Sequence, residues 1–460
     1  MFEYQNEPFD FADLSYLAIA LPDEIRYLKY AGDFQGECAA IDRLCRRDDL
    51  PLGLKKRLWL EKVIACGMEE DYRLSVEDML ADMRKTYADF SKEDLTALME
   101  ATRQIDFIRR GDKIYFQDAA PAMLREVYEE RLPANRQTAG CRPEKDRLRY
   151  ENAERMLATG KSAYRFTLRE SIRVCPEALC REPILFHLPF PAECPSQSEI
   201  RLLASSHPVR ISGAAQRTAA IQLDSYAGEE VFIEFSYVNC ARLYRPDPNR
   251  IDAKQPDFYT GEEYPHIRFT PFLRELAREI AGDEVNPLRL ARRVYDYVTR
   301  TIRYSYLREY LLIDNIPEFT ALNGRGDCGA QALLFITLCR ILGIPARWES
   351  GKSVLPTHCS SHDWSMFYLA PYGWMYADLS AGGGAFASGD TFLHDFYFGS
   401  IDPFRMVANT EFQRAFEPPK VYMRDDPYDN QNGEAEYRSH GLSYRQLEKH
   451  SEVLSAEELS

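Results

Sequence analysis

The sequence contains 11 cysteines but no pair of cysteines separated by two residues, the spacing that zinc ribbons use. An odd number of scattered cysteines also argues against a disulfide framework. Runs of lysine and arginine are scarce too, and the formal net charge is -15. Because phosphate groups are bound by concentrated positive charge, we expect no nucleic-acid partner, and the reduced thiols indicate a cytoplasmic protein.

Long apolar segments are missing as well. No stretch is long enough to cross a bilayer, and residues 1–22 carry no lysine or arginine ahead of their short apolar run, unlike a secretory signal. A calcium-binding loop pattern is also absent. We therefore expect no membrane partner, no cofactor and no metal site, while the oligomeric state stays open.

What the chain does have is length. At 460 residues and 53.2 kDa it exceeds one ordinary hydrophobic core, so several domains are expected. Helical and strand-like patterns together predict an α+β multidomain protein. The predicted parts are an N-terminal α-helical domain, a small antiparallel β domain, an α+β catalytic core and an acidic, polar C-terminal tail, over residues 1–155, 156–250, 251–410 and 411–460.

These divisions follow local patterns. Ser75 and Ser91 each begin a capping-box pattern that starts a helix, whereas residues 231–238 alternate apolar and polar side chains as a half-buried strand does. Beyond residue 416 the chain becomes polar and acidic. This composition favours a mobile tail with a last helix over 443–454.

One segment, residues 323–348, places a cysteine at the start of a strongly apolar helix. Asp327 is a good N-cap, so Cys328 falls in the first helical turn, and the following residues to Leu342 are apolar nearly all round. The positive end of the helix dipole favours a nucleophilic thiolate there. The alternative is that Cys328 is a small, inert core residue, as we expect for Cys339.

A β-hairpin is predicted downstream, with its turn over residues 371–373. His362 lies near the start of its first strand and Asp378 near the end of its second, so the two side chains could lie on adjacent strands. If the hairpin packs on the helix that Cys328 begins, thiol, imidazole and carboxylate can align as nucleophile, base and orienting group.

Three motifs in this order resemble the core of the transglutaminase-like superfamily over about residues 265–400. They are the block around Cys328, the sequence HDW that begins with His362, and the sequence GW that precedes Asp378. The resemblance implies a papain/transglutaminase-like α+β core in which these three residues form the catalytic set.

Two positions depart from the common pattern of this superfamily. Asp363 stands where a small residue usually follows the histidine, and Ser365 stands where asparagine or glutamate is common. We expect neither to touch the three catalytic residues, although both bear on substrate preference.

The resemblance implies a cysteine enzyme that acts on amide bonds of peptides or proteins through a thioester acyl-enzyme, as a protease or amidase or as a transglutaminase. We expect water to be the usual acceptor, because the sequence shows neither an apolar tunnel nor a dedicated amine pocket. The alternative is a non-catalytic peptide- or protein-binding module that has kept the fold.

Further candidates have simpler explanations beside the functional ones. Asn323 could be the second oxyanion donor after the Cys328 backbone N–H, or merely a turn former. The aromatic residues Tyr304, Trp364 and Trp374 could line a substrate groove, but core or sheet packing is the simpler explanation. Residues 358–363 group two histidines with a cysteine and an aspartate, but no matching ligand pair elsewhere supports a metal site.

Overall fold

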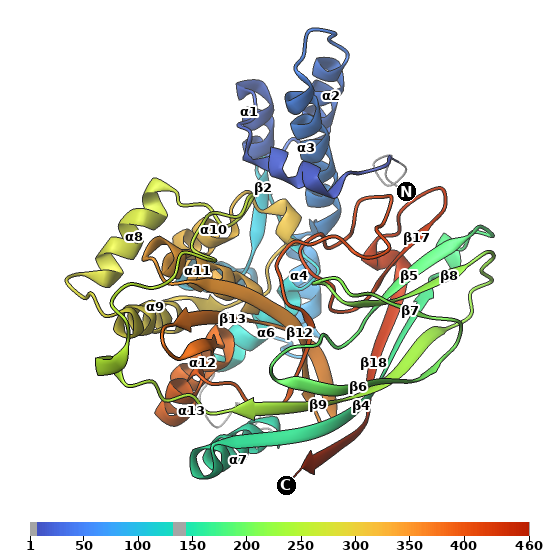
Figure 1. Cartoon of the computed structure of the whole chain (residues 1–460). Coiled ribbons are helices and arrows are strands. Elements are labelled where there is room, and N and C mark those ends of the chain that lie inside the picture. Colours follow the sequence, from blue (N-terminus) through green and yellow to red (C-terminus); the bar gives the residue numbers. More distant parts are fainter. Residues whose placement is uncertain (1–6, 132–143, 460) are drawn as a thin grey trace.

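A five-stranded antiparallel sheet with helix α11 (Cys328–Ile341) packed on one face lies at the centre of the fold, in the computed structural model of residues 7–131 and 144–459 (Figure 1). The strand order is β15-β14-β13-β12-β16. The strands are β12 (Ala346–Leu355), β13 (His358–Leu369), β14 (Gly373–Ala377), β15 (Phe398–Gly399) and β16 (Arg405–Asn409). β13 and β14 form the predicted hairpin.

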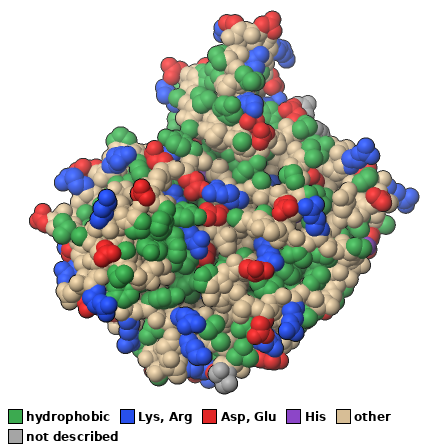
Figure 2. All heavy atoms as spheres, in the orientation of Figure 1, with side chains coloured by type: hydrophobic (Ala, Val, Ile, Leu, Met, Phe, Trp, Pro, Cys, Tyr) green, Lys and Arg blue, Asp and Glu red, His purple; other side chains and the backbone are tan. Residues whose placement is uncertain are grey.

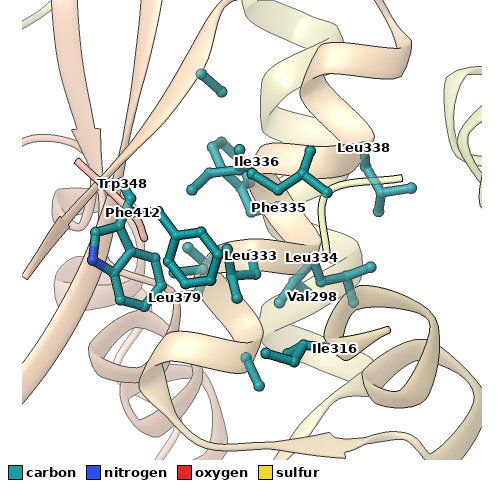
Figure 3. Close-up of a cluster of buried hydrophobic side chains, with 14 of the residues drawn as sticks. Val298, Ile316, Leu333, Leu334, Phe335, Ile336, Leu338, Trp348, Leu379 and Phe412 are labelled. Atoms are coloured by element: carbon teal, nitrogen blue, oxygen red, sulfur yellow. The ribbon is translucent and has the colours of Figure 1, made fainter. Parts of the chain in front are cut away.

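Helix α11 is apolar on all sides because other elements cover all of it. β12 and β13 lie on one side, and α8, α9, α10 and α12 pack around the rest. Figure 3 shows Leu333 and Phe335 of α11 in one buried cluster with Trp348 of β12 and the later residue Phe412. Each such side chain contributes about 1.5–3 kcal/mol when buried, so the helix is held firmly.

The helices of this core follow the start and stop signals of the sequence. Thr270 and Asn286 cap α8 and α9, and each is followed by a proline in the first turn. The core helices are α8 (Pro271–Ala281), α9 (Pro287–Thr301), α10 (Ile316–Asn323), α11, α12 (Leu379–Ala387) and α13 (Thr391–Phe396).

The N-terminal region is mainly helical, as predicted, and α1, α2 and α3 project from the rest of the molecule (Figure 1). Both capping boxes, at Ser75 and Ser91, are confirmed. A three-stranded sheet is added, because Gly111 adopts a left-handed turn between two short strands. The elements are α1 (Asp23–Ala31), α2 (Phe34–Cys45), α3 (Leu52–Asp71), β1 (Tyr72–Leu74), α4 (Val76–Arg84), α5 (Lys92–Ala101), β2 (Phe107–Arg110), β3 (Lys113–Gln117), α6 (Ala120–Arg131) and α7 (Glu144–Thr159).

Two four-stranded antiparallel sheets follow, ordered β17-β5-β8-β7 and β18-β4-β9-β6. Their inner faces share one apolar cluster that includes Phe166, Phe186 and Phe235, which confirms the antiparallel β region. The strands are β4 (Lys161–Val174), β5 (Ile184–Pro189), β6 (Gln197–Ser205), β7 (Arg210–Ile211), β8 (Thr218–Leu223), β9 (Val231–Arg242), β17 (Glu434–Tyr437) and β18 (Leu447–Leu459). The domain boundaries stay predictions.

The C-terminal part is not the mobile tail that its composition suggests, and the helix predicted over 443–454 is wrong. β17 pairs with β5 and β18 pairs with β4, so each completes one of these two sheets. The segment 411–433 before them is largely buried. The sequence of β18 looks helical because it is rich in strong helix formers such as glutamate, leucine, alanine and lysine, but pairing along the edge of the sheet decides its structure.

Charged side chains of both signs are interspersed over the face shown in Figure 2. Within residues 7–131 and 144–459, no helix combines the length and the apolar character that crossing a membrane requires. The described cysteines are all free thiols.

Ending the chain at Ser443 removes β18 and leaves the backbone of β4 unpaired along an edge of its sheet. We expect a lower thermal unfolding midpoint and self-association, because exposed edge strands pair with other chains. Calorimetry and size-exclusion chromatography measure both effects. A chain ending at Leu459 keeps the strand and serves as the control, and equal midpoints for the two chains would contradict a structural role for β18.

Candidate functional site

Cys328 is the first residue of α11, and the turn before it is fixed by hydrogen bonds. Asp327 caps the helix by accepting a hydrogen bond from Ala330 N at 2.9 Å. Its same oxygen accepts a hydrogen bond of 2.6 Å from the Tyr310 hydroxyl. The short parallel pair β10 (Arg303–Tyr304) and β11 (Arg325–Gly326) holds the preceding loop. The half-buried cysteine is therefore set at a rigid helix start.

Gly329 allows this helix start to lie very close to its neighbours. A Cβ built at this position would lie 2.1 Å from the Tyr310 hydroxyl oxygen, 2.8 Å from Asp363 Oδ2 and 2.8 Å from the Trp348 ring. These contacts are with three different elements, so no single side-chain movement would relieve them. Glycine is required here by the close approach of helix and sheet.

The thiol of Cys328 donates a hydrogen bond to Asp363 Oδ2 at 3.2 Å. The expectation that Asp363 does not touch the catalytic residues is therefore wrong. Side chains alternate along β13, and Asp363 shares the face that packs on α11 with Ser365, whose hydroxyl donates to Ala332 O at 3.4 Å. A small residue here would leave space beside the thiol, whereas the aspartate fills it.

Burial raises the pKa of the Cys328 thiol well above its ordinary value, and the nearby carboxyls of Asp363 and Asp327 raise it further. The resting residue is therefore a neutral thiol rather than the thiolate that the helix start alone favours. The helix dipole acts on Cys328 as expected, but two carboxyls and the loss of water oppose it.

His362 and Asp378 meet as predicted, with His362 Nε2 and Asp378 Oδ2 2.8 Å apart. Asp378 is fully buried and caps α12, where its other oxygen accepts a hydrogen bond from Ala381 N at 3.0 Å. The imidazole is 13% exposed, so one edge of the ring faces solvent. This pair has the geometry of a carboxylate that orients a base.

Arg405 is a further member of the site that the sequence reasoning missed. Its Nη2 donates to Asp378 Oδ2 at 2.7 Å, and its Nη1 donates to Asp402 Oδ1 at 3.0 Å. Burial alone would raise the pKa of Asp378, but His362 and Arg405 together hold it below its ordinary value. The signal in the sequence was a single arginine inside the apolar run of 404–408.

The thiol of Cys328 contacts Asp363, whereas His362, the preceding residue of β13, lies on the other face of the strand, with its ring 5.9 Å from that of Trp364. The thiol is hydrogen-bonded to Asp363 and the imidazole to Asp378. Between the thiol and the imidazole themselves there is no hydrogen bond in the described structure. Catalysis by these groups therefore requires a rearrangement that brings the thiol and the imidazole together.

The segment 411–433 closes over this part of β13, and sequence reasoning gave it no role. Gln431 Nε2 donates to the carbonyl oxygen of His362 at 3.3 Å and also to Asp363 Oδ1. Asp429 lies beside Asp363, and its carboxyl accepts a hydrogen bond from the Ser350 hydroxyl at 2.5 Å. Two residues of the supposed tail thus contact the active-site strand.

The other predicted residues have different surroundings. Asn323 is the last residue of α10, and its amide donates to Phe319 O at 2.7 Å, as a helix-end residue does. Trp364 is buried, and its indole N–H donates to Glu349 Oε2 at 3.1 Å, so it does not line a groove. Trp374 packs with the ring of Phe258 and is similarly explained by packing.

Tyr304 is the predicted groove residue that the structure places beside the thiol. It is 41% exposed. Burial, followed by the charges of Cys328 and Asp327, raises the pKa of its hydroxyl. A peptide that approaches Cys328 would meet this ring.

As for metals, the described residues hold no group of three or more histidine, cysteine or carboxylate side chains arranged to bind an ion.

Residues 274–379 match the family model of the transglutaminase-like superfamily. The matched range includes Cys328, His362 and Asp378, and it confirms the resemblance that their motifs carry. This part of the chain is a transglutaminase-like domain.

Two solved structures are similar in fold. One, from Cytophaga hutchinsonii, is provisionally described as a cysteine protease, and it shares 13% identity over 64% of this chain and 91% of that chain, with a TM-score of 0.41. The other is the periplasmic domain of TgpA from Pseudomonas aeruginosa, with 13% identity over 53% of this chain and 96% of that chain and a TM-score of 0.27. Both similarities are weak. A search of curated proteins finds no match.

The substitution Gly329→Ala tests the tight packing at the start of α11. We expect it to destabilise the fold by about 1–3 kcal/mol, because the added Cβ overlaps Tyr310, Asp363 and Trp348. Chemical denaturation measures the change. Gly384→Ala in α12 is the matched control, since a Cβ there meets nothing within 4 Å. The second change Tyr310→Phe removes the nearest atom and should recover part of the loss; a Gly329→Ala protein as stable as the control would contradict the packing.

Proposed function

We propose that the chain is a cysteine enzyme that acts on amide bonds of peptides or proteins through a thioester on Cys328. The observation that supports this most is the buried pair of His362 and Asp378, 2.8 Å apart and backed by Arg405. A fully buried carboxylate held by an imidazole and a buried arginine is costly to maintain and has no simple packing explanation.

In the proposed reaction, His362 takes the thiol proton from Cys328 and the sulfur attacks the amide carbonyl. The backbone N–H of Cys328 belongs to the first helical turn, which leaves it free to donate to the developing oxyanion. The leaving amine takes the proton from His362. Water, deprotonated by the same imidazole, then attacks the thioester and releases the acid.

Hydrolysis is favoured over transfer to an amine. Cys328 is half-buried and His362 has an exposed edge, so water reaches both groups. The carboxyls of Asp327 and Asp363 beside the sulfur would attract a protonated amine, but a protonated amine is not a nucleophile. Transfer would require a site that keeps the amine neutral and excludes water.

The alternative is a peptide-binding module without catalysis. The observation in its favour is that the thiol rests on Asp363 with a raised pKa, which makes the resting sulfur a poor nucleophile. Against it stands the complete set of Cys328, His362 and Asp378. In either case a peptide or protein is the proposed partner, and we further propose a cytoplasmic location, which agrees with the free thiols of the described cysteines.

Cys328→Ala should abolish activity and leave the fold intact, because one small residue replaces another at the helix start. Casein or a glutamine peptide is incubated with a labelled primary amine and either protein, and released ammonia, new termini and incorporated amine are counted by mass spectrometry. We expect ammonia or new termini from the wild type alone. Equal turnover by both proteins would exclude Cys328 as nucleophile, and no turnover by the wild type would favour the binding module. If incorporation exceeds hydrolysis, the enzyme is a transglutaminase.

Asp378→Asn should lower kcat/KM by about two to four powers of ten, because the amide no longer holds the imidazole in the required tautomer. The amide also leaves Arg405 with one carboxylate partner, so thermal unfolding is measured in parallel to separate stability from catalysis. Asp390→Asn, another helix cap of the same domain, is the matched control. A loss below about threefold with a folded protein would mean that another group orients His362.

A further inference from the structure

Asp363 touches the reacting atom of the site, yet no step of the proposed reaction uses it. Its Oδ2 accepts the hydrogen bond of the Cys328 thiol at 3.2 Å, and its Oδ1 accepts one from Gln431 Nε2. The residue is 7% exposed, so both oxygens are committed to these partners inside the protein. The carboxyl joins the nucleophile of α11 to the segment 411–433.

The groups that face this carboxyl are mostly acidic. These groups come from α11 and its cap, β10, η5 (Tyr310–Leu312) and the segment 411–433. They are Cys328, Asp327, Tyr304, Tyr310, Asp426, Asp429 and Gln431. On β13 itself, the residue next to Asp363 is His362. A negative charge on Asp363 is therefore opposed by burial and by the charges around it, and favoured by its hydrogen bonds with Cys328, Asp429 and Gln431.

We propose that Asp363 controls the ionisation of the nucleophile: as a carboxylate it keeps the proton on Cys328, and as a neutral acid it permits the thiolate. This inference rests on the proposed function, because it concerns the same cysteine. The thiolate is therefore favoured at lower pH, where Asp363 carries a proton and the sulfur can attack.

The protons balance in this scheme. With Asp363 ionised, the S–H of Cys328 donates to Oδ2, and a thiolate would face a second negative charge at hydrogen-bond distance. When Asp363 takes one proton from solvent, its O–H can donate to the sulfur. Once a rearrangement brings Cys328 and His362 together, the thiol proton passes to the nitrogen of His362 that Asp378 does not hold, which leaves a thiolate, an imidazolium and a neutral carboxyl.

The environment sets the range in which this change occurs. Burial, followed by the charge of Asp327, raises the pKa of Asp363 to about 7. Because a raised carboxyl pKa means that the neutral acid persists to higher pH, Asp363 and the interacting carboxyl of Asp429 keep a proton to higher pH than an ordinary aspartate does. Gln431 donates to the ionised form, so its removal should extend the neutral range upward.

The test is the alkylation rate of Cys328 by iodoacetamide, read by peptide mass spectrometry between about pH 5.5 and pH 8.5 and divided by the rate of Cys240 in the same sample. Asp363→Asn removes the titrating charge and keeps the shape. We expect the mutant and the wild type to agree at the acid end, and the mutant to react about tenfold faster or more at the alkaline end.

Gln431→Ala provides an independent variant that keeps Asp363. In this variant, the pH above which labelling of Cys328 becomes slower than in Asp363→Asn should be higher than in the wild type. Gln413→Ala is its matched control from the same segment, because the side-chain amide of Gln413 donates to the carbonyl oxygen of Tyr264 at 3.1 Å rather than to Asp363. A ratio of mutant to wild type that stays constant across the pH range, including no reaction of either, would overturn the proposal.

Labelling needs no substrate, so the two proposals fail separately. If the ratio of mutant to wild-type labelling rates depends on pH but no turnover is found, the role of Asp363 is supported and the proposed enzyme activity is contradicted. Turnover with a constant labelling ratio would do the reverse. Thermal unfolding of each variant shows whether the labelled protein is folded. If the Asp363→Asn protein is unfolded, the labelling profile of Gln431→Ala decides the test.

Discussion

The packing of α11 against β13 determines where the groups of the site lie. Because Gly329 has no side chain, the first turn of the helix approaches β13 closely enough for the Cys328 sulfur to reach Asp363 at 3.2 Å. The apolar body of the helix is buried on all sides, which prevents this turn from shifting. Core packing and the position of the nucleophile therefore depend on the same interface.

Two buried carboxyls of the site act in opposite ways. Asp378 has Arg405 and His362 as neighbours, remains ionised and orients the imidazole. Asp363 lies among other carboxyls, so its ionised form is disfavoured, and its proton determines the charge beside the sulfur. The difference comes from the neighbours alone, since both side chains are the same and both are removed from water.

Local patterns predicted the helix start at Cys328, the hairpin and the meeting of His362 with Asp378, because capping and alternation are encoded within a few residues. Asn323 and Trp364 were candidates by type, but their hydrogen bonds are made elsewhere. Contacts between distant parts of the chain were missed. Gln431 reaches the site, and β18 pairs with β4, only through the tertiary fold.

The most direct test of this account is the protonation state of Cys328 at rest, measured as the S–H stretching band in the infrared difference between wild type and Cys328→Ala at neutral pH. We expect an S–H band whose frequency is lowered by the hydrogen bond to Asp363 and is different in the Asp363→Asn protein. Absence of the band, with the ultraviolet absorbance of a thiolate in its place, would show a resting ion pair and contradict the account.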